Sequence, residues 1–333
     1  MLCRAPSSGC KSKATNSMLS PNNDIATLIT SQAASLGFDA CGFAAASPVD
    51  DEAVARYDRW IEQGHHGCMQ WAAGHRDLRR DPSMLLEGAQ TVISLALNYY
   101  PASFQPPETL RVAYYAYGRD YHEVLREKLT QLARFIEQIT QCSTRPCVDS
   151  APIRERYWAQ QAGLGFIGRN DCLILPGKGS FFFLGEIVTT AKLPPDKPCL
   201  MSCGDCGKCV EACPAKALNN DGTVDASRGL SCLLIENHDD ELPAWVGEVI
   251  GNRVVGCDSC QLCCPHNAHA VATTIEDFAP TEAVMTLTHE RICSMKPGDF
   301  KRTFAHSAIS RLRFKTLQRN AHLVAKADRN EPK

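Results

Sequence analysis

The sequence predicts an α+β fold, in which an N-terminal α/β domain precedes a ferredoxin-like iron–sulfur domain and a helical, basic C-terminal tail. Segments with helical and strand-like apolar spacing alternate as far as residue 193. Two cysteine runs follow, at 203–213 and 257–264. From 296 to 329 the chain carries nine lysines and arginines against two aspartates.

The N-terminal domain opens with a helix expected at 24–36, which Asp24 would cap and Gly37 would end. Further helices are expected at 51–64, 120–141 and 153–162, and the one at 120–141 carries a long apolar stripe. The near-continuous apolar run at 89–100 indicates a buried strand. Other strands are expected at 38–46, 146–149, 172–175 and 180–191, the last two joined by the turn at 176–179.

A proline-rich loop is expected at 101–108, and residues 194–198 form a linker into the cysteine-rich part. Beyond 267 the pattern favours helices at 280–290 and 308–327. The first 17 residues are small and polar, which indicates a disordered extension or a mis-assigned start, with Met18 as the true one.

Composition is typical of a globular protein, with 44% apolar and 22% charged residues and a net charge of −2. No apolar run approaches the roughly 20 residues that span a bilayer, and no secretory signal precedes the folded part. We therefore expect a cytoplasmic protein with no membrane contact, and a monomer. The basic C-terminal stretch indicates either a phosphate-binding surface or a solvated helix face.

The cysteine spacing predicts two [4Fe–4S] clusters. The first run has the C-x2-C-x2-C-x3-C-P pattern of bacterial two-cluster ferredoxins, in which the cysteine before proline binds the other cluster. Cys232 lies alone between the runs and can supply the eighth thiolate. We assign one cluster to Cys203, Cys206, Cys209 and Cys264, and the other to Cys213, Cys232, Cys257 and Cys260. Cys263 is an alternative to Cys264, which we prefer because it precedes Pro265.

Zinc and disulfide bonds are the alternatives for these cysteines. Zinc ribbons use two C-x2-C pairs about 15–20 residues apart, and reducing cytosol disfavours disulfides. The N-terminal domain contains neither a GxGxxG fingerprint after a strand nor a P-loop. The residues alone thus indicate an α/β enzyme that receives single electrons.

Several motifs carry a resemblance to a known family. Outside the cysteine runs they are GHHGCMQW (64–71), LRRDP (78–82), AYGRDYH (116–122), VDSAPIRERYWAQQAGLGFIGRN (148–170) and SFFFLGEIVTT (180–190). Together with CGDCGKCVEACP, Cys232 and IGNRVVGCDSCQLCCPHN, they resemble epoxyqueuosine reductase from about residue 20 onward. The resemblance implies that cob(I)alamin, fed by two clusters, reduces epoxyqueuosine to queuosine at the wobble position of tRNA.

The resemblance also implies the domains and their roles. Residues 18–195 would form a nitroreductase-like, cobalamin-binding catalytic domain, 196–270 the ferredoxin-like domain with two [4Fe–4S] clusters, and 271–333 the basic helical segment that contacts tRNA. An external one-electron donor and the anticodon stem-loop would be the partners.

Asp149 is the residue that the resemblance marks as proton donor, and burial against the corrin would raise its pKa toward that role; a helix-capping carboxylate is the alternative. The remaining candidates for cofactor contact are Arg79, Asp149, Gly168, Asn170 and Asp258. Tyr121 and His122 would face the substrate pocket, and Arg311, Arg313 and Lys315 would contact phosphates. A salt bridge is the alternative for Arg79, a plain turn for Gly168 and Asn170, and a solvated loop acid for Asp258.

Two other functions remain open from the sequence. A cobalamin-dependent reductive dehalogenase acting on a small molecule would share the cofactors. A non-catalytic two-cluster electron carrier would share the cysteine runs.

Overall fold

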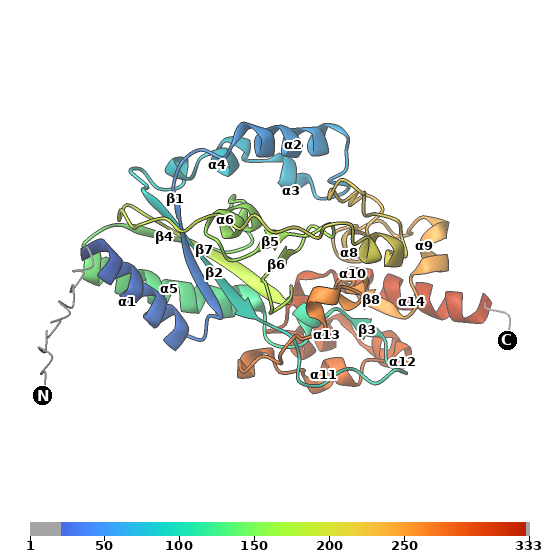
Figure 1. Ribbon diagram of the computed structural model, residues 1–333. Coiled ribbons are helices and arrows are strands. Elements are labelled where there is room, and N and C mark those ends of the chain that lie inside the picture. The colour runs from blue at the N-terminus through green and yellow to red at the C-terminus, as the bar shows by residue number, and fades with distance from the viewer. Residues whose placement is uncertain (1–20, 331–333) are drawn as a thin grey trace, which may run out of the picture.

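The computed structural model describes residues 21–330, so the expectations for residues 1–17 and Met18 lie outside the described part. A four-stranded antiparallel sheet forms the centre of the N-terminal half (Figure 1). Its order is β1-β2-β7-β4, with strands Ala40–Ala45, Thr91–Asn98, Phe182–Thr189 and Thr144–Cys147.

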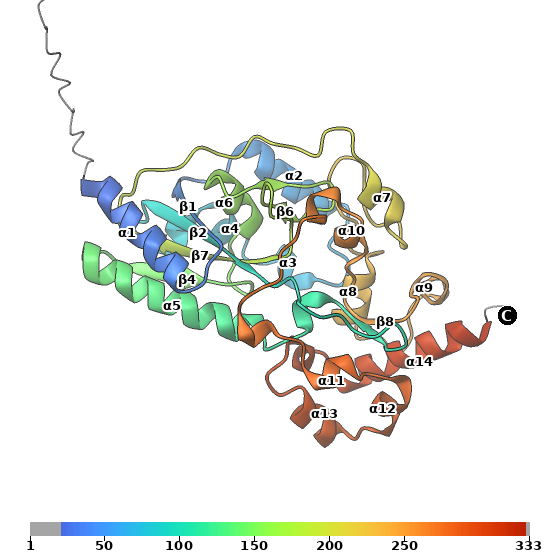
Figure 2. The same ribbon diagram turned by 60° about the horizontal axis from the view of Figure 1, so that its bottom comes forward.

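Helices cover both faces of this sheet. The α1 helix (Pro21–Ser35) and the α5 helix (Tyr121–Thr140) lie side by side on one face, as Figure 2 shows. The α6 helix (Glu155–Gln161) covers the other. Strand β2 is buried from Thr91 to Leu97 because alternate side chains enter two different cores, Ile93 toward α1 and α5 and Val92 toward α6. The expected buried strand is confirmed.

A lobe of short helices reaches from the sheet to the cysteine-rich part. It contains α2 (Asp51–Glu62), α3 (Gln70–Ala73) and α4 (Arg76–Arg80). The Trp60 indole N–H donates to the carbonyl of Val224 over 2.6 Å, and the Ala226 N–H donates to the carbonyl of His65 over 2.7 Å. These bonds fix the lobe against the loop that leads to Cys232.

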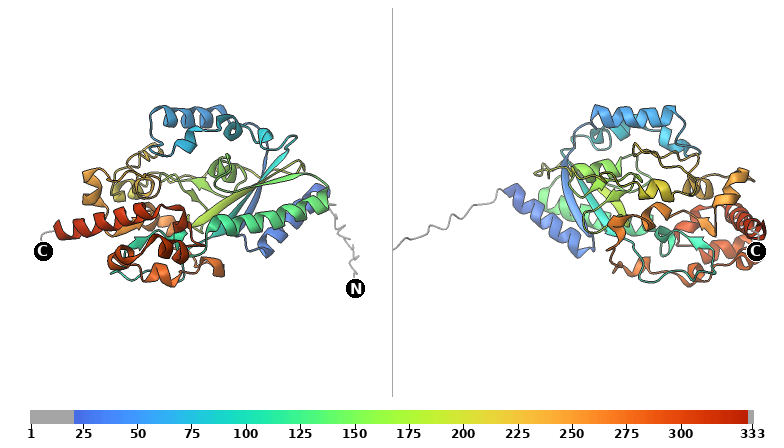
Figure 3. Two further views of the ribbon diagram at one scale, coloured as in Figure 1. Left: turned by 180° about the vertical axis from the view of Figure 1, so that it is seen from behind. Right: turned by 45° about the vertical axis from the view of Figure 1, so that its right-hand side comes forward.

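A second core lies in the C-terminal half but includes a segment from the N-terminal half. Strand β3 (Arg111–Val112) pairs in parallel with β8 (Arg253–Val255). The α14 helix (Phe314–Asn330) packs along β8, α8 (Leu230–Ile235) and α12 (His289–Ser294), and its position is seen from behind in Figure 3. Residues 110–117 therefore join the core that the C-terminal half forms.

The remaining elements are short. They are α7 (Lys208–Ala212), α9 (Ala244–Val249), α10 (Ser259–Leu262), α11 (Glu282–Met285), α13 (Pro297–Thr303), β5 (Phe166–Ile167), β6 (Leu173–Ile174), and the 3₁₀ turns η1 (Pro82–Met84), η2 (Tyr114–Ala116), η3 (Pro265–Asn267), η4 (Glu276–Phe278) and η5 (Ala308–Arg311). Within 21–330 no helix combines the length and apolar character needed to cross a membrane.

Three expectations about elements were wrong in detail. The first helix begins at Pro21, so Asp24 lies in its first turn and is not its cap. The expected helix at 280–290 is split, because Thr288 adopts an extended backbone and caps a new helix, α12. The expected helix at 308–327 begins only at Phe314, since Leu312 is extended.

Candidate active site and cluster ligands

The centre of the candidate site is a buried imidazole between two carboxylates. Asp120 caps α5 by accepting from the His122 backbone N–H over 3.0 Å. The His122 side chain is 2.6 Å from Asp120 through Nδ1 and 2.7 Å from Asp149 through Nε2. His122 is 5% exposed, whereas the Asp149 side chain is 48% exposed. The pair therefore connects a buried imidazole to a half-exposed carboxylate on a loop.

Charges decide the protonation of this pair. Burial would raise the pKa of Asp149, but the hydrogen bond and charge of His122, with the charge of Arg311, lower that pKa below its ordinary value. Burial would lower the pKa of His122, but the hydrogen bonds that its ring makes to the carboxylates of Asp120 and Asp149 raise it. Burial thus acts on the pKa of Asp149 in the expected direction, but the imidazole beside it favours the carboxylate and the net shift is downward. The role of Asp149 as proton donor stays a prediction.

A further carboxyl group, Glu155, adjoins Asp149, and a second one, Glu186, lies near Glu155; sequence reasoning missed both. The backbone N–H of Asp149 donates to Glu155 Oε1 over 2.7 Å. Asp149 itself has a positive φ of 37°. Burial and the charge of Asp149 raise the pKa of Glu155 to about 7. Glu186 is fully buried in β7, and burial and Glu155 raise its pKa. An acid in the middle of the apolar stretch FLGEIV was the signal that could have identified Glu186.

Tyr121 is packed against rings on both sides. Its ring stacks on Phe183 at 4.3 Å and on His122 at 3.9 Å. Because both His122 nitrogens are engaged by carboxylates, His122 reaches a substrate only through Asp149. The expected substrate contact of Tyr121 stays a prediction.

The loop at 168–172 lies beside a predicted cluster ligand. A hydrogen bond to Cys172 and burial raise the pKa of Cys260, and Asn170 also contacts this thiol. Asn170 is 6% exposed, and its Nδ2 has no hydrogen-bond partner in the described part of the chain. A Cβ on Gly168 would lie 2.6 Å from Ile174 Cδ1. A buried, unpaired amide on a tightly packed loop suits a bound group rich in carbonyl acceptors, as the amide side chains of a corrin are.

Arg79 and Asp258 differ in the hydrogen bonds and ion pairs that their side chains form. Arg79 donates only to the carbonyl of Gly74, over 3.4 Å, and has no acidic partner within 21–330. Arg80 instead forms the ion pair with Asp58. Asp258 accepts from the Tyr114 N–H over 2.8 Å, and burial raises its pKa to about 6. Asp258 is thus a half-buried acid that holds the η2 turn and not a fully solvated loop acid.

The predicted ligands of the first cluster gather where α7 meets α10. Burial raises the pKa of Cys264, and the neighbouring Cys203, Cys263 and Cys206 raise it further. Cys263 also lies near Cys206. Since both thiols lie at this position, the choice of Cys264 over Cys263 stays a prediction.

The predicted ligands of the second cluster lie against the C-terminal core. Cys213 and Cys257 pack on it, and Cys232 is buried within α8. Cys68 of the α2–α4 lobe has its Sγ 3.1 Å from Cys232 Sγ, a contact that spacing gave no reason to expect. The described cysteines are all free thiols. Cys260, the fourth predicted ligand, lies beside Asn170 and Cys172. The division of the cysteines between the two clusters stays a prediction.

The basic residues divide into two kinds. Arg311, Arg313 and Lys315 are exposed, and Arg311 lies near enough to Asp149 and Asp120 to lower their pKa values. Arg319 instead donates to the backbone carbonyls of Leu233, Asn237 and Asp239. The phosphate-facing candidates are therefore the three residues before and at the start of α14.

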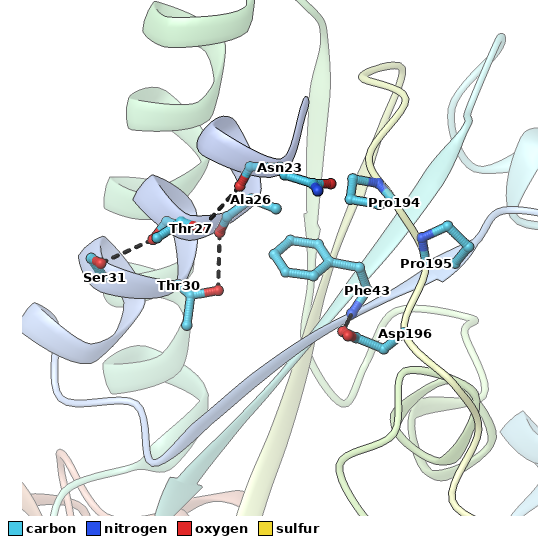
Figure 4. A pocket seen from close by; sticks show the side chains of 9 residues that line it. All are labelled: Asn23, Ala26, Thr27, Thr30, Ser31, Phe43, Pro194, Pro195 and Asp196. Carbon is cyan, nitrogen blue, oxygen red and sulfur yellow. Dashed lines mark hydrogen bonds between the residues drawn. The ribbon is translucent and has the colours of Figure 1, made fainter. Parts of the chain in front are cut away.

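An open hollow between α1 and the 194–196 linker is separate from this site (Figure 4). Its only acid, Asp196, accepts from the Phe43 N–H over 2.9 Å. None of the predicted site residues lines it.

Comparison with known proteins gives two family matches. Residues 79–150 match a model described as epoxyqueuosine reductase QueG, DUF1730, and residues 202–267 match a 4Fe-4S double cluster binding domain. The second match spans both cysteine runs and confirms the expectation of two clusters.

Relatives and solved structures agree with these matches. The chain is 41% identical to the epoxyqueuosine reductase of Gloeobacter violaceus, over 89% of this chain and 94% of the relative. It is 38% identical to that of Escherichia coli, over 87% and 78%. A crystal structure of epoxyqueuosine reductase with an epoxyqueuosine-modified tRNA-Tyr stem loop superposes with a TM-score of 0.83 at 30% identity, covering 91% of this chain and 81% of that one. The expected resemblance and the α+β fold are confirmed: the chain belongs to the epoxyqueuosine reductase family.

Proposed function

We propose that this protein reduces epoxyqueuosine to queuosine in tRNA, using cobalamin and two [4Fe–4S] clusters, with Asp149 and His122 as the proton source. The observation that carries the proposal is the Asp149–His122 contact of 2.7 Å, made on a loop residue that is half exposed. The loop at 168–172, which touches Cys260, supports the same location. The names of the relatives supply the substrate.

The reaction sets the requirements for the residues. Converting an epoxide to an alkene consumes two electrons and two protons and releases the oxygen as water. Cobalamin, when bound, supplies a nucleophile for carbon, and the clusters supply electrons one at a time. The oxygen that leaves carbon needs a proton at that moment, so an acid must lie beside it.

His122 and Asp149 meet this requirement together. The raised pKa of His122 favours the protonated imidazole, and Asp149 is the member of the pair that reaches the surface. Proton transfer from His122 to Asp149 Oδ2, and then to the oxygen, moves no heavy atom far. Asp120 fixes the imidazole through Nδ1, and Glu155 fixes the Asp149 backbone. A solved Bacillus subtilis relative, 30% identical with a TM-score of 0.80, has an aspartate-bearing catalytic loop swung out of its active site.

The cofactor and tRNA contacts complete the proposal. Within 21–330 neither Asn170 Nδ2 nor the Arg79 side chain has an acidic partner, so both would donate to corrin side chains. Gly168 would let the loop that carries Asn170 pack closely against Ile174. The exposed Arg311, Arg313 and Lys315 would bind anticodon stem-loop phosphates and bring the wobble base to Asp149. An external donor would deliver electrons to the clusters.

A conversion assay tests the function. Cluster-loaded protein is incubated anaerobically with cobalamin, a chemical reductant and a stem-loop containing epoxyqueuosine, and the product is weighed by mass spectrometry. The proposal predicts loss of one oxygen atom, which disappears when cobalamin or reductant is omitted. An unchanged stem-loop, with both clusters intact and cobalamin bound, would contradict the proposal. The protein would then be an electron carrier or an enzyme that acts on another class of substrate.

A further inference from the structure

Two histidines and a cysteine meet at the surface of the C-terminal half, far in sequence from the cluster ligands. His289 and Cys293 lie one turn apart on α12, and His322 lies on α14, which packs along α12. Their ligand atoms all lie within 4.8 Å of one another. His289 is half-buried, whereas Cys293 and His322 are exposed. The proposed reduction uses none of the three.

The geometry points to a metal site, and we propose that His289, Cys293 and His322 bind one divalent ion of the zinc class. Cys293 Sγ lies 3.3 Å from His289 Nε2 and 3.4 Å from His322 Nε2. In a tetrahedral zinc site, Zn–N and Zn–S bonds of about 2.05 and 2.3 Å place nitrogen and sulfur about 3.5 Å apart. Both observed separations are within about 0.2 Å of that value.

The ligand types select the ion. Two imidazoles and one thiolate are nitrogen and sulfur ligands, which suit zinc and exclude magnesium and calcium, ions that take oxygen. The i,i+4 spacing of His289 and Cys293 places both side chains on one helix face. Because Cys293 and His322 are exposed, a water molecule can fill the fourth position. A thiol that donates to one imidazole and accepts from the other would have similar distances, so metal uptake decides between the two.

Such an ion would join two elements that are otherwise held by packing alone at this point. The α14 helix also packs on α8, which carries Cys232, and on β8. An ion bound by α12 and α14 would therefore favour the folded arrangement of these helices against α8, which carries the predicted ligand Cys232. Binding to the folded state but not to the unfolded chain would raise the thermal midpoint.

Zinc content of the cluster-loaded protein tests the site. Wild type and the variants Cys293→Ser, His289→Gln and His322→Gln are dialysed anaerobically against micromolar zinc chloride and then against buffer, and zinc and iron are measured together. The proposal predicts one zinc per chain more in wild type than in each variant, at equal iron content. Zinc-edge X-ray absorption should show nitrogen and one sulfur in the first shell.

The controls remove a thiol and an exposed imidazole elsewhere. Cys142→Ser and His306→Gln should keep the wild-type zinc content, and zinc should raise the thermal midpoint of these proteins but not that of Cys293→Ser. Equal zinc in wild type and Cys293→Ser, with iron intact, would overturn the proposal and leave a hydrogen-bonded trio. Neither result depends on epoxyqueuosine turnover.

Discussion

His122 is the residue whose charge state matters most to the candidate site, because it is buried and both ring nitrogens contact carboxylates. Its raised pKa stabilises the folded state fully below the unfolded value of about 6.5, and this contribution is lost as pH rises through the folded pKa. The lowered pKa values of Asp120 and Asp149 have the opposite sign. Their contribution is present above the unfolded value of about 3.9 and is lost as pH falls through the folded pKa. All three contributions thus coincide between about pH 4 and 6.5.

Replacing His122 with Gln should remove the alkaline part of this dependence. The expected result is a difference in thermal midpoint between wild type and His122→Gln that is largest near pH 6 and shrinks toward pH 9. Anaerobic melting of the two cluster-loaded proteins, with equal iron content, measures it. Parallel curves over that range would show that the imidazole carries no stabilising proton.

The sequence predicts which residues form the candidate site better than it predicts which residues surround them in space. Asp149 is identifiable from its motif, but the direction of its pKa is not, because His122 comes from a helix 27 positions earlier. The contact of Cys68 with Cys232 spans 164 positions and has no spacing signal. Such contacts follow from tertiary packing, which a pattern along the chain does not contain.

Among the elements, the start of α5 positions the proton pair and is clamped by the turn around η4. Gly118 lies just before α5, and a Cβ there would be 2.3 Å from the carbonyl oxygen of Asp277 and 2.6 Å from Phe278 Cα. The Arg119 N–H donates to that same carbonyl over 2.7 Å. Only a residue without a side chain fits this close approach. The two contacting atoms belong to the backbone and cannot rotate away as the end of a side chain could.

Replacing Gly118 with Ala should therefore destabilise the protein by about 1–3 kcal/mol, as overpacking does. The thermal midpoint should fall, and kcat should fall with it as the turn shifts the His122 helix. Gly74→Ala is the matched control, since its Cβ would meet only the carbonyl of Trp71 at 3.4 Å. If both variants have the thermal midpoint of the wild type, the turn around η4 yields to the added methyl group more easily than these distances indicate.

Elements with a long apolar repeat were predictable, and short ones were not. The α5 helix and strand β2 lie within a residue or two of their expected ranges because seven or more positions define each period. The break between α11 and α12 depends on the backbone of Thr288, which a local pattern does not specify. Strand β3 has two residues, and only its partner β8 makes it a strand.

At the scale of the whole molecule, the stretch of exposed basic residues begins close to the proton pair. Arg311 is close enough to Asp149 to affect its pKa, so a stem-loop held by Arg311, Arg313 and Lys315 would lie next to the acid. Arg319 belongs to the same sequence stretch but is committed to backbone carbonyls. The charge of the stretch was thus predictable from sequence, whereas the split between binding and structural arginines was not.

Reversing the charges of Arg311, Arg313 and Lys315 should weaken stem-loop binding and lower its salt dependence. Each lost phosphate contact reduces the slope of log K against log salt by about 0.7–0.9, so the triple variant should lose roughly 2 to 3. Fluorescence anisotropy at several salt concentrations measures the slope. A triple reversal of the exposed Arg134, Lys192 and Lys197 is the control and should leave the slope nearly unchanged. Equal slopes in the two triple variants would show that Arg311, Arg313 and Lys315 belong to a solvated helix face and do not contact phosphates.

The central claim is that this chain removes the oxygen of epoxyqueuosine with a proton delivered by Asp149. Its most direct test is a single-turnover assay of wild type and Asp149→Asn, each with equal iron and bound cobalamin, read by the mass of the stem-loop. Wild type should lose one oxygen atom, and the amide, which has no proton of suitable acidity, should slow that loss by about 10²–10⁴-fold. Comparable conversion by both proteins would contradict the role of Asp149, and no conversion by the loaded wild type would contradict the function itself.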